Sequence, residues 1–460
     1  MGLWPRGYCR ELSSLLKRLS LQLDYRDIDL HQFIYIGLAI RVGLLLRSFR
    51  KQTPLAPPFN KPVETREEFV VEETRVRTWW SMNSMECLLA SGQNRTALTT
   101  YSETAEIGMP CREEAFVWGD VSSLRHLTDS AEPSEKESLI LAVRHWSTIN
   151  CWVSSGGVKK ESHPPWSPLS RFAELQGVLR SWREQLPPKL QYDQTFFVMH
   201  AVNKQTGPYG FLHLVYFSSV IFLHREYLQF FPVQGPTYRG RLPKGLDQAY
   251  EGIDVDAFWT SSLKDLFNAA ARITEILVEL ERHDAVMLTP FLGFAAFSAA
   301  TVNMYLAIFS WVYPDLAAGA RERTETDVRF LKQVVGLWPL AQQWYQTVLR
   351  LYESYKQFHM DGGAPESPSG KTIDAFHSFD RSLMDYGEIK PEPDDMAAIV
   401  AAKDTDGYKH GTELKYPRSN EDNDDGLQGI PQFGEEGYWD TVADEFLSSI
   451  MTFDAPITMS

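Results

Sequence analysis

Apolar side chains that recur every three to four residues constrain the fold of this chain more than any other feature. One such run extends from Leu263 to Leu280, and several more occur between residues 1 and 360. Thr65–Glu68 and Ser134–Glu137 both fit the Ser/Thr-x-x-Glu capping box, which marks the first turn of a helix. No stretch shows the alternating pattern of a β-strand. We therefore predict an all-α protein with a large multi-helical domain over residues 1–360.

Three of the predicted helices carry specific expectations. The helix that opens at Thr65 should run to Ser91, where Gly92 stops it. The segment "VRFLKQVVGLWPLAQQWYQTVLRLYESYKQF" has the pattern of one long helix, bent at Pro339. "DLHQFIYIGLAIRVGLLLRS" is apolar on nearly every face, which predicts a buried helix in which Arg41 needs a partner.

Residues 285–314 form an uncharged stretch that is long enough to span a bilayer. Pro290 and Asn303 interrupt it, and its flanks lack the Lys/Arg asymmetry that orients a membrane helix. We interpret the stretch as a buried core helix and expect no membrane partner.

The acidic charge of the chain is concentrated near its C-terminus. Of 45 Lys+Arg and 60 Asp+Glu, residues 361–460 hold 7 and 22, which leaves 38 of each sign in the remaining 360 residues. This segment is poor in aliphatic residues and rich in Gly, Pro and Ser, which predicts a disordered acidic tail. Residues 430–455 intersperse acids with apolar side chains, a pattern typical of activation segments. The candidate anchors for a coactivator are Trp439, Phe446, Leu447 and Phe453.

A tryptophan pair marks the helix that opens at Thr65, in the stretch "EETRVRTWWS". Glu73 precedes Arg77 by four residues, which is the favoured orientation for an ion pair. Asn83 shares a helical stripe with Trp80 and therefore needs a hydrogen-bond partner. Residue chemistry alone favours a well-packed helix with a buried aromatic seam and a charged outer side. The same stripe also contains Val76, Cys87 and Ala90.

Several segments, in order, resemble the fungal-specific transcription factor domain, the middle homology region of fungal binuclear zinc-cluster transcription factors. The first three are "GLAIRVG" at residues 37–43, "EETRVRTWWSMNSMECLLASGQN" at 72–94 and "IGMPCREEAF" at 107–116. "LQGVLRSWREQLPPKL", "FLHREYLQFFP", "TPFLGFAAFSAATVNMYL" and "LKQVVGLWPLAQQWYQTV" resemble the C-terminal half of that domain. The resemblance covers most of residues 30–355, with the middle homology core at about 30–120. It implies that certain residues form a structural scaffold and contact no substrate: Gly37, Arg41, Arg75, Arg77, Trp79 and Trp80.

The cysteines do not fit the DNA-binding domain of that family, in which six cysteines hold two zinc ions. This chain has four, namely Cys9, Cys87, Cys111 and Cys151. We therefore expect no cofactor in this chain, with zinc confined to an N-terminal domain that is missing from it, as in a truncated product. The alternative is a regulator without its own DNA reader. Neither the body nor the tail has a basic excess, so we expect DNA contact only indirectly or through the missing domain.

Motifs for catalysis or nucleotide binding are absent from the sequence, and we expect no enzyme. His213 and His224 lie on one apolar helix, which favours core histidines over a base or metal ligands. The alternative function is a helical small-molecule-binding protein or enzyme whose tail only aids solubility. A pocket with converging polar groups would favour that alternative.

The resemblance implies a nuclear regulator of RNA polymerase II transcription. Its body would regulate and form a homodimer, and its tail would recruit a coactivator or the general transcription machinery. Ile389–Glu392 fits the apolar-Lys-x-Glu pattern that accepts a ubiquitin-like modifier, which makes Lys390 a candidate modification site. The target genes, the inducing ligand and the choice between activation and repression are left open.

Overall fold

The computed structural model describes residues 28–45, 65–90, 97, 99, 104, 107–119, 133–232, 234–235, 237–243, 245–246, 254–286 and 289–360. The chain divides into two units, Met1–Glu388 and Ile389–Ser460, and every described residue belongs to the first.

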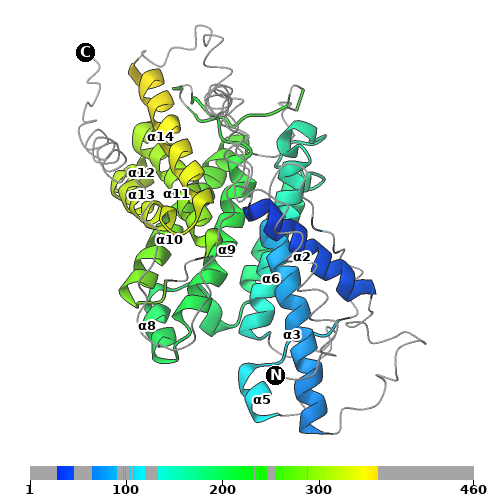
Figure 1. The fold of residues 1–460 in the computed structure, drawn as a ribbon. Helices are drawn as coiled ribbons and strands as arrows, with labels where there is room; N and C mark the ends of the chain where they lie inside the picture. Colours follow the sequence, from blue (N-terminus) through cyan, green and yellow to red (C-terminus); the bar gives the residue numbers. More distant parts are fainter. Residues whose placement is uncertain are drawn as a thin grey trace, which may run out of the picture. The chain divides into compact units, whose positions relative to one another are not determined.

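The described part of the chain is helical and contains no strand, which confirms the all-α prediction (Figure 1). The α-helices are α2 (Ile28–Leu45), α3 (Arg66–Leu89), α5 (Glu113–Trp118), α6 (Glu135–Ser154), α7 (Arg171–Glu184), α8 (Gln194–Val202), α9 (Thr206–Arg225), α10 (Val255–Arg282), α11 (Pro290–Ile308), α12 (Pro314–Ala317), α13 (Ala320–Val335) and α14 (Pro339–Met360). Short 3-10 helices are η2 (Gly157–Lys160), η3 (Pro188–Leu190) and η4 (Ser310–Val312).

Local sequence signals set where these helices begin. Before α3, the Glu68 amide donates to Thr65 Oγ1 at 3.2 Å and the Thr65 amide donates to the Glu68 carboxylate at 3.4 Å. Ser134 and Glu137 form the same reciprocal box before α6, so both predicted capping boxes are confirmed. α3 ends at Leu89 rather than at the predicted Ser91, and Gly92 lies outside the described residues.

The uncharged stretch of the sequence contains the helix α11, which packs against α9, α10, α13 and α14 (Figure 1). Every residue of α11 from Phe291 to Leu306 is buried. Pro290 starts this helix rather than interrupting it, because the first helical position needs no amide donor. In the described part of the chain, α9 and α11 are long and apolar enough to cross a membrane, but 78% and 89% of their apolar windows are buried inside the protein. This is the burial of core helices, as we predicted for α11.

Aromatic side chains fill the space between α6, α9, α11 and α14. The ring centroid of Trp146 lies 4.7 Å from that of Phe222 and 6.0 Å from that of Phe294. Phe294 in turn lies 5.5 Å from Trp344. Trp146 and Trp344 are fully buried, so their large aromatic surfaces stabilise the core and do not form an exposed patch.

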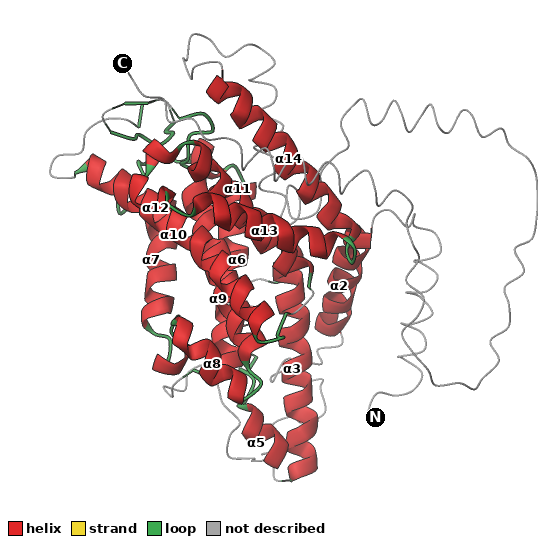
Figure 2. Ribbon diagram, turned by 90° about the vertical axis from the view of Figure 1, so that its left-hand side faces the viewer, coloured by secondary structure: helices red, strands yellow, loops and turns green. Residues whose placement is uncertain are grey.

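The helix α2 packs along α3, as both views of the fold show (Figures 1 and 2). Its buried positions are Gly37, Ile40 and Gly43, which are three residues apart and lie on one face. The prediction of a helix buried on all sides is therefore wrong among its described positions. Arg41, for which we expected a partner, lies on the exposed face, so burial does not demand a partner for it.

The prediction of one long bent helix around Pro339 is wrong as well. α13 ends at Val335, and α14 starts at Pro339. Proline disfavours helical backbone at the residue before it and is well tolerated as the first residue of a helix. The proline therefore separates two helices here, and the Trp338 amide closes the turn with the Val334 carbonyl at 3.0 Å.

Candidate functional site

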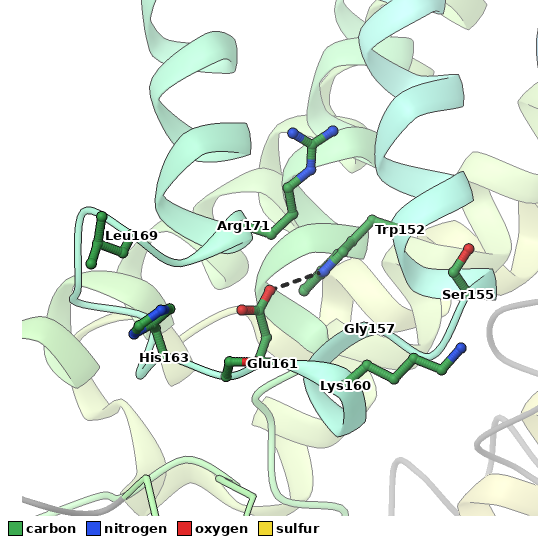
Figure 3. A pocket seen from close by; sticks show the side chains of 9 residues that line it. Trp152, Ser155, Gly157, Lys160, Glu161, His163, Leu169 and Arg171 are labelled. Carbon is green, nitrogen blue, oxygen red and sulfur yellow. Dashed lines mark hydrogen bonds between the residues drawn. The ribbon is translucent and has the colours of Figure 1, made fainter.

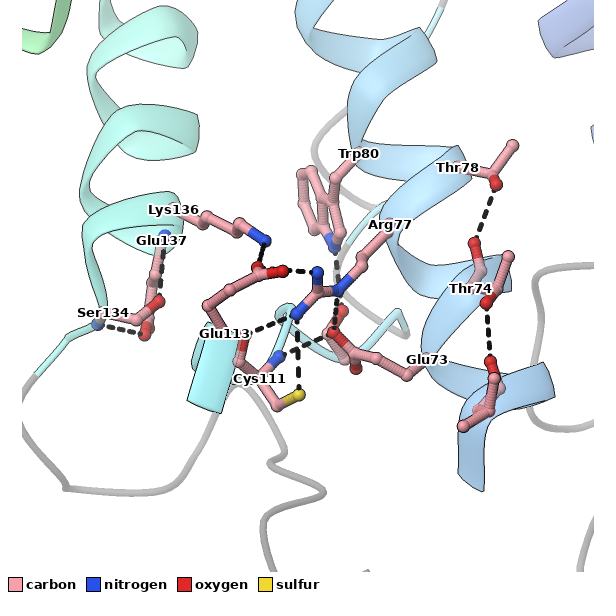
Figure 4. A network of polar contacts seen from close by, with 12 residues as sticks. Glu73, Thr74, Arg77, Thr78, Trp80, Cys111, Glu113, Ser134, Lys136 and Glu137 are labelled. Atoms are coloured by element: carbon pink, nitrogen blue, oxygen red, sulfur yellow. Dashed lines mark hydrogen bonds and ion pairs between the residues drawn. The ribbon is translucent and has the colours of Figure 1, made fainter. Parts of the chain in front are cut away.

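The acidic and basic groups of α3 meet the segment of residues 107–119 in one polar network (Figure 4). Glu73 is the buried centre of this network, with 1% of its side chain exposed. It accepts a hydrogen bond from Arg77 Nε at 2.7 Å and another from the Cys111 amide at 3.0 Å. The predicted ion pair of Glu73 with Arg77 is confirmed. A carboxylate at this depth is tolerated because it is both paired and hydrogen-bonded.

The guanidinium of Arg77 links α3 to residues 111–116. It donates to the Glu113 carboxylate at 2.8 Å and to the Cys111 carbonyl at 3.3 Å, and it lies 4.0 Å from the ring centroid of Phe116. Lys136 of α6 binds the same Glu113. Burial by itself would lower the pKa of Arg77, but the hydrogen bonds to Glu73 and Glu113 outweigh it and raise that pKa. The network therefore holds Arg77 charged and in one position.

The two tryptophans of the motif are buried beside this network. Trp79 and Trp80 pack in a cluster that joins α2, α3, residues 107–109 and α6. Trp80 Nε1 donates to the Gly108 carbonyl at 2.8 Å. The structure therefore brings Arg77, Trp79 and Trp80 together against residues 107–116. The cluster consists of Ile40, Val76, Trp79, Trp80, Ile107, Met109 and Ile140.

The other residues of the predicted scaffold lie apart from this network. Arg75 has 36% of its side chain exposed and pairs with Glu72 at 3.6 Å. Gly37 is buried on the face of α2 that packs on α3, whereas Arg41 is exposed. The six residues therefore divide into a buried group and two surface arginines, a distinction that the motif alone does not reveal.

Asn83, the polar residue in the α3 stripe, has a hydrogen-bond partner. Asn83 Nδ2 donates to Thr99 Oγ1 at 2.7 Å, and Thr99 Oγ1 donates to the Glu86 carboxylate at 2.6 Å. Asn83 and Glu86 are both buried. The predicted hydrogen bond of Asn83 is confirmed, and it fixes a residue of the segment after α3 to the helix.

The remaining titratable candidates are inert core groups. Burial raises the pKa values of Cys87 and Cys111 to about 11, so both are protonated thiols at neutral pH. Burial lowers the pKa values of His213 and His224 to about 3, and His224 Nδ1 lies 2.8 Å from Ser262 Oγ. The core interpretation of both histidines is confirmed. No cluster of three or more His, Cys, Asp or Glu is placed to hold a metal within the part of the chain that the structure describes.

A surface pocket of about 340 Å³ lies where α6 ends and α7 begins (Figure 3). Trp152 forms one wall and donates its Nε1 hydrogen to Glu161 at 3.1 Å. Lys160 comes from η2 and Arg171 from the first turn of α7, on different sides of this hydrogen bond (Figure 3). The pocket also includes Ser155, Gly157, Ser162, His163 and Leu169.

The loop under this pocket is held by a buried carboxylate. Glu226, at the end of α9, accepts a hydrogen bond from the Val158 amide at 3.0 Å. Gly157 has φ of +47°, and a Cβ at this position would lie 2.0 Å from Glu226 Oε2. Sequence reasoning missed this pocket. The Gly156-Gly157 pair before two lysines was the only signal in the sequence, and its contact with residue 226 depends on the tertiary fold.

The predicted tail residues lie outside the described residues. They are Trp439, Phe446, Leu447, Phe453 and Lys390.

Comparison with known proteins addresses the family resemblance directly. No family model and no solved structure matches the chain. The chain is 24% identical over 402 residues to the "Uncharacterized transcriptional regulatory protein PB1A11.04c" of Schizosaccharomyces pombe. That alignment covers 77% of this chain and 56% of the Schizosaccharomyces pombe protein. It is 24% identical over 376 residues to the Zn(2)-C6 fungal-type transcription factor FTF1c of Fusarium oxysporum, and the alignment covers 77% of this chain and 38% of FTF1c. For FTF1a of the same fungus the identity is 23% over 416 residues, and the alignment covers 84% of this chain and 37% of FTF1a.

The chain thus spans between 37% and 56% of the length of these curated relatives. The similarity extends over most of the described helical body and supports, at a coarse level, the predicted resemblance: the chain is similar to fungal transcription factors.

Proposed function

We propose that this protein is a transcriptional regulator of fungal type. The observation that carries the proposal is the similarity of more than three quarters of the chain to proteins named as transcription factors or transcriptional regulators. Those relatives are not named as enzymes, which supports a non-catalytic role. In this proposal the helical body, residues 1–360, is a regulatory domain that forms a homodimer in the nucleus.

The acidic tail, residues 361–460, would activate RNA polymerase II transcription by binding a coactivator or the general transcription machinery. Its 22 acidic residues keep the neighbouring aromatic side chains solvated and available. The aromatic side chains supply affinity when the segment folds into an apolar groove on its partner. The residues proposed to make this contact are Trp439, Phe446, Leu447 and Phe453.

We propose that DNA recognition does not come from a zinc cluster within these 460 residues. A binuclear cluster needs six cysteines, and the sequence has four. The two Fusarium relatives are longer than the aligned region, and they carry Zn(2)-C6 in their names. Zinc and direct DNA contact would then belong to a segment outside this chain or to a partner protein.

The test is a reporter assay in a fungal host. Residues 361–460, and separately the whole chain, are fused to an unrelated DNA-binding domain. Activation by both fusions supports an activator, and activation by the tail alone supports a body that masks its tail. Silence from both fusions contradicts the proposed activation.

The anchors are tested in the same assay with Trp439, Phe446 and Phe453 all changed to Ala. The matched control changes Phe376, Phe379 and Tyr386 to Ala, which removes the same number of aromatic side chains outside residues 430–455. We expect the first variant to lose activation and the control to keep it. Equal activity of both variants would refute the assignment of the anchors.

We also propose Lys390 as an acceptor for a ubiquitin-like modifier. The Lys390→Arg variant should lose a slowly migrating band on an immunoblot, and Lys403→Arg, in the same tail, should keep it. A band that persists in the first variant contradicts the assignment.

One observation favours a second candidate function, the binding of a small molecule: the pocket between α6 and α7. The two functions are compatible in one chain, because a regulatory domain can carry a ligand site.

A further inference from the structure

We propose that the pocket between α6 and α7 binds a small organic anion that contains an aromatic ring. This inference rests on the geometry of the pocket and does not depend on the proposed role in transcription. Its volume of about 340 Å³ is within the range of small-molecule sites. All of its lining residues lie between positions 152 and 171, so one short segment forms the whole site.

The apolar part of the ligand has two surfaces to contact. Trp152 presents an indole ring at the end of α6, and Leu169 stands opposite in the loop before α7 (Figure 3). Leu169 is 73% exposed, which leaves apolar area that a ligand can cover. An aromatic ring between these two side chains would remove both from water.

The charged part of the ligand is selected by the lining cations. Lys160 has no ion-pair partner among the described residues, and Arg171 pairs only with Glu174, one turn along α7. That pair is solvent-exposed, so it contributes little stability and leaves the guanidinium able to bind a second anion. The only carboxylate that lines the pocket, Glu161, is already bound to Trp152 Nε1. The lining residues thus include two cations and one carboxylate, so their net charge is positive.

The pocket is held in shape before a ligand arrives. Glu226 fixes the Val158 amide, and Arg241 lies 3.7 Å from Glu226 and compensates its buried charge. Gly157 allows this approach because it has no side chain. A site whose loop is already ordered loses less conformational entropy on binding, which favours affinity for a small ligand.

Two aromatic side chains pack together next to the pocket-lining Arg171. Phe172, next to Arg171, lies 5.0 Å from Tyr227 between ring centroids. The Tyr227 hydroxyl is buried and has no hydrogen-bond partner among the described residues. Burial first, and then the nearby charges of Glu161 and Glu226, raise the pKa of Tyr227. Tyr227 does not line the pocket, so its role is to pack against Phe172.

Titration calorimetry of the full chain tests the inference. The probes are indole-3-acetate and phenyl phosphate, and the neutral counterpart is indole-3-acetamide. We expect at least one anion to bind about tenfold more tightly than the amide, because the amide carries no charge for Lys160 and Arg171. The double variant Lys160→Gln, Arg171→Gln should weaken the binding of that anion by about tenfold or more.

The matched control is Lys332→Gln, which removes an exposed lysine from α13 and should leave the affinity unchanged. Circular dichroism checks that all variants keep their helical content, which we expect because Lys160 and Arg171 are both exposed. No binding of either anion at millimolar concentration overturns the proposal. Binding that the double variant retains also overturns it, since the anion would then sit elsewhere. The reporter assay with the tail fusion is independent of these outcomes, so the two proposals can fail separately.

Discussion

Replacement of Arg77 by Met would remove the positive charge that pairs with Glu73 in the α3 network and keep most of the apolar stem. Glu73 would then be left with 1% of its side chain exposed and with only the Cys111 amide as a donor among the contacts described above. The carboxylate would have to stay ionised without its partner, take up a proton, or reach solvent by local opening. Each of these outcomes lowers the free energy of unfolding.

The size of the effect follows from the burial of the two partners. Breaking a buried ion pair by removal of one member costs about 3–5 kcal/mol. Arg77 keeps 18% of its side chain exposed, so water reaches the site and the lower end, about 3 kcal/mol, is expected. In urea, with a slope of about 3 kcal/mol per molar, this loss moves the unfolding midpoint by about 1 M.

The chain supplies a control two residues away. Arg75 lies on the same helix but is 36% exposed and pairs with Glu72 at 3.6 Å, so Arg75→Met should cost less than about 1 kcal/mol. Unfolding is followed by tryptophan fluorescence, which reports on all 13 tryptophans of the chain, Trp79 and Trp80 among them. The double variant Glu73→Gln, Arg77→Met should be more stable than Arg77→Met alone, because no unpaired charge stays buried.

Equal losses for Arg77→Met and Arg75→Met would refute the reasoning. A double variant that is less stable than Arg77→Met alone would show that the buried charge of Glu73 is not the cause of the loss.

Three further outcomes follow from buried groups elsewhere in the body. Gly157→Ala should lower the free energy of unfolding by about 2–3 kcal/mol, because φ is +47° and the new Cβ would clash with Glu226. Gly177→Ala in α7 should raise it by about 0.5–1 kcal/mol, because no atom lies within 4 Å of the new Cβ. Equal effects of the two substitutions in urea titrations would contradict this prediction. In a Cys9→Ser background at pH 8, iodoacetamide should label the exposed Cys151 first. Cys87 and Cys111 are buried with pKa values near 11, so they should stay unmodified in the native state. If peptide mass spectra show Cys87 and Cys111 labelled as fast as Cys151, the two thiols are not buried. Burial raises the pKa of Asp327 from 3.8 to about 8, so the folded state keeps a proton that the unfolded chain has lost, and the free energy of unfolding should fall as the pH rises from about 4 to 8. Asp327→Asn should flatten that dependence, and an unchanged pH profile would count against the assignment.

Local signals in the sequence predict most of the helices and several contacts within them. The capping boxes at Thr65 and Ser134 act through hydrogen bonds three residues apart, so they are visible without tertiary information. The Glu73–Arg77 pair is one helical turn long and is equally local. Pro339 shows the limit of such reasoning, because the sequence pattern fits both a bent helix and two helices.

The sequence by itself therefore determined the helical class, the starts of α3 and α6, the stripe on α3 and the acidic segment at the end of the chain. Tertiary structure alone decided which polar residues became buried. Arg41 and Arg77 both follow apolar residues in helices. Arg41 is exposed, whereas Arg77 is partly covered by a second segment, which it contacts at positions 34 and 36 residues further along the chain. The pocket is the clearest case, because Glu226 reaches the Val158 amide across 68 residues. The physical reason is that hydrogen bonds within one helix depend on the spacing of neighbours, whereas burial of a charge depends on what distant segments bring to it.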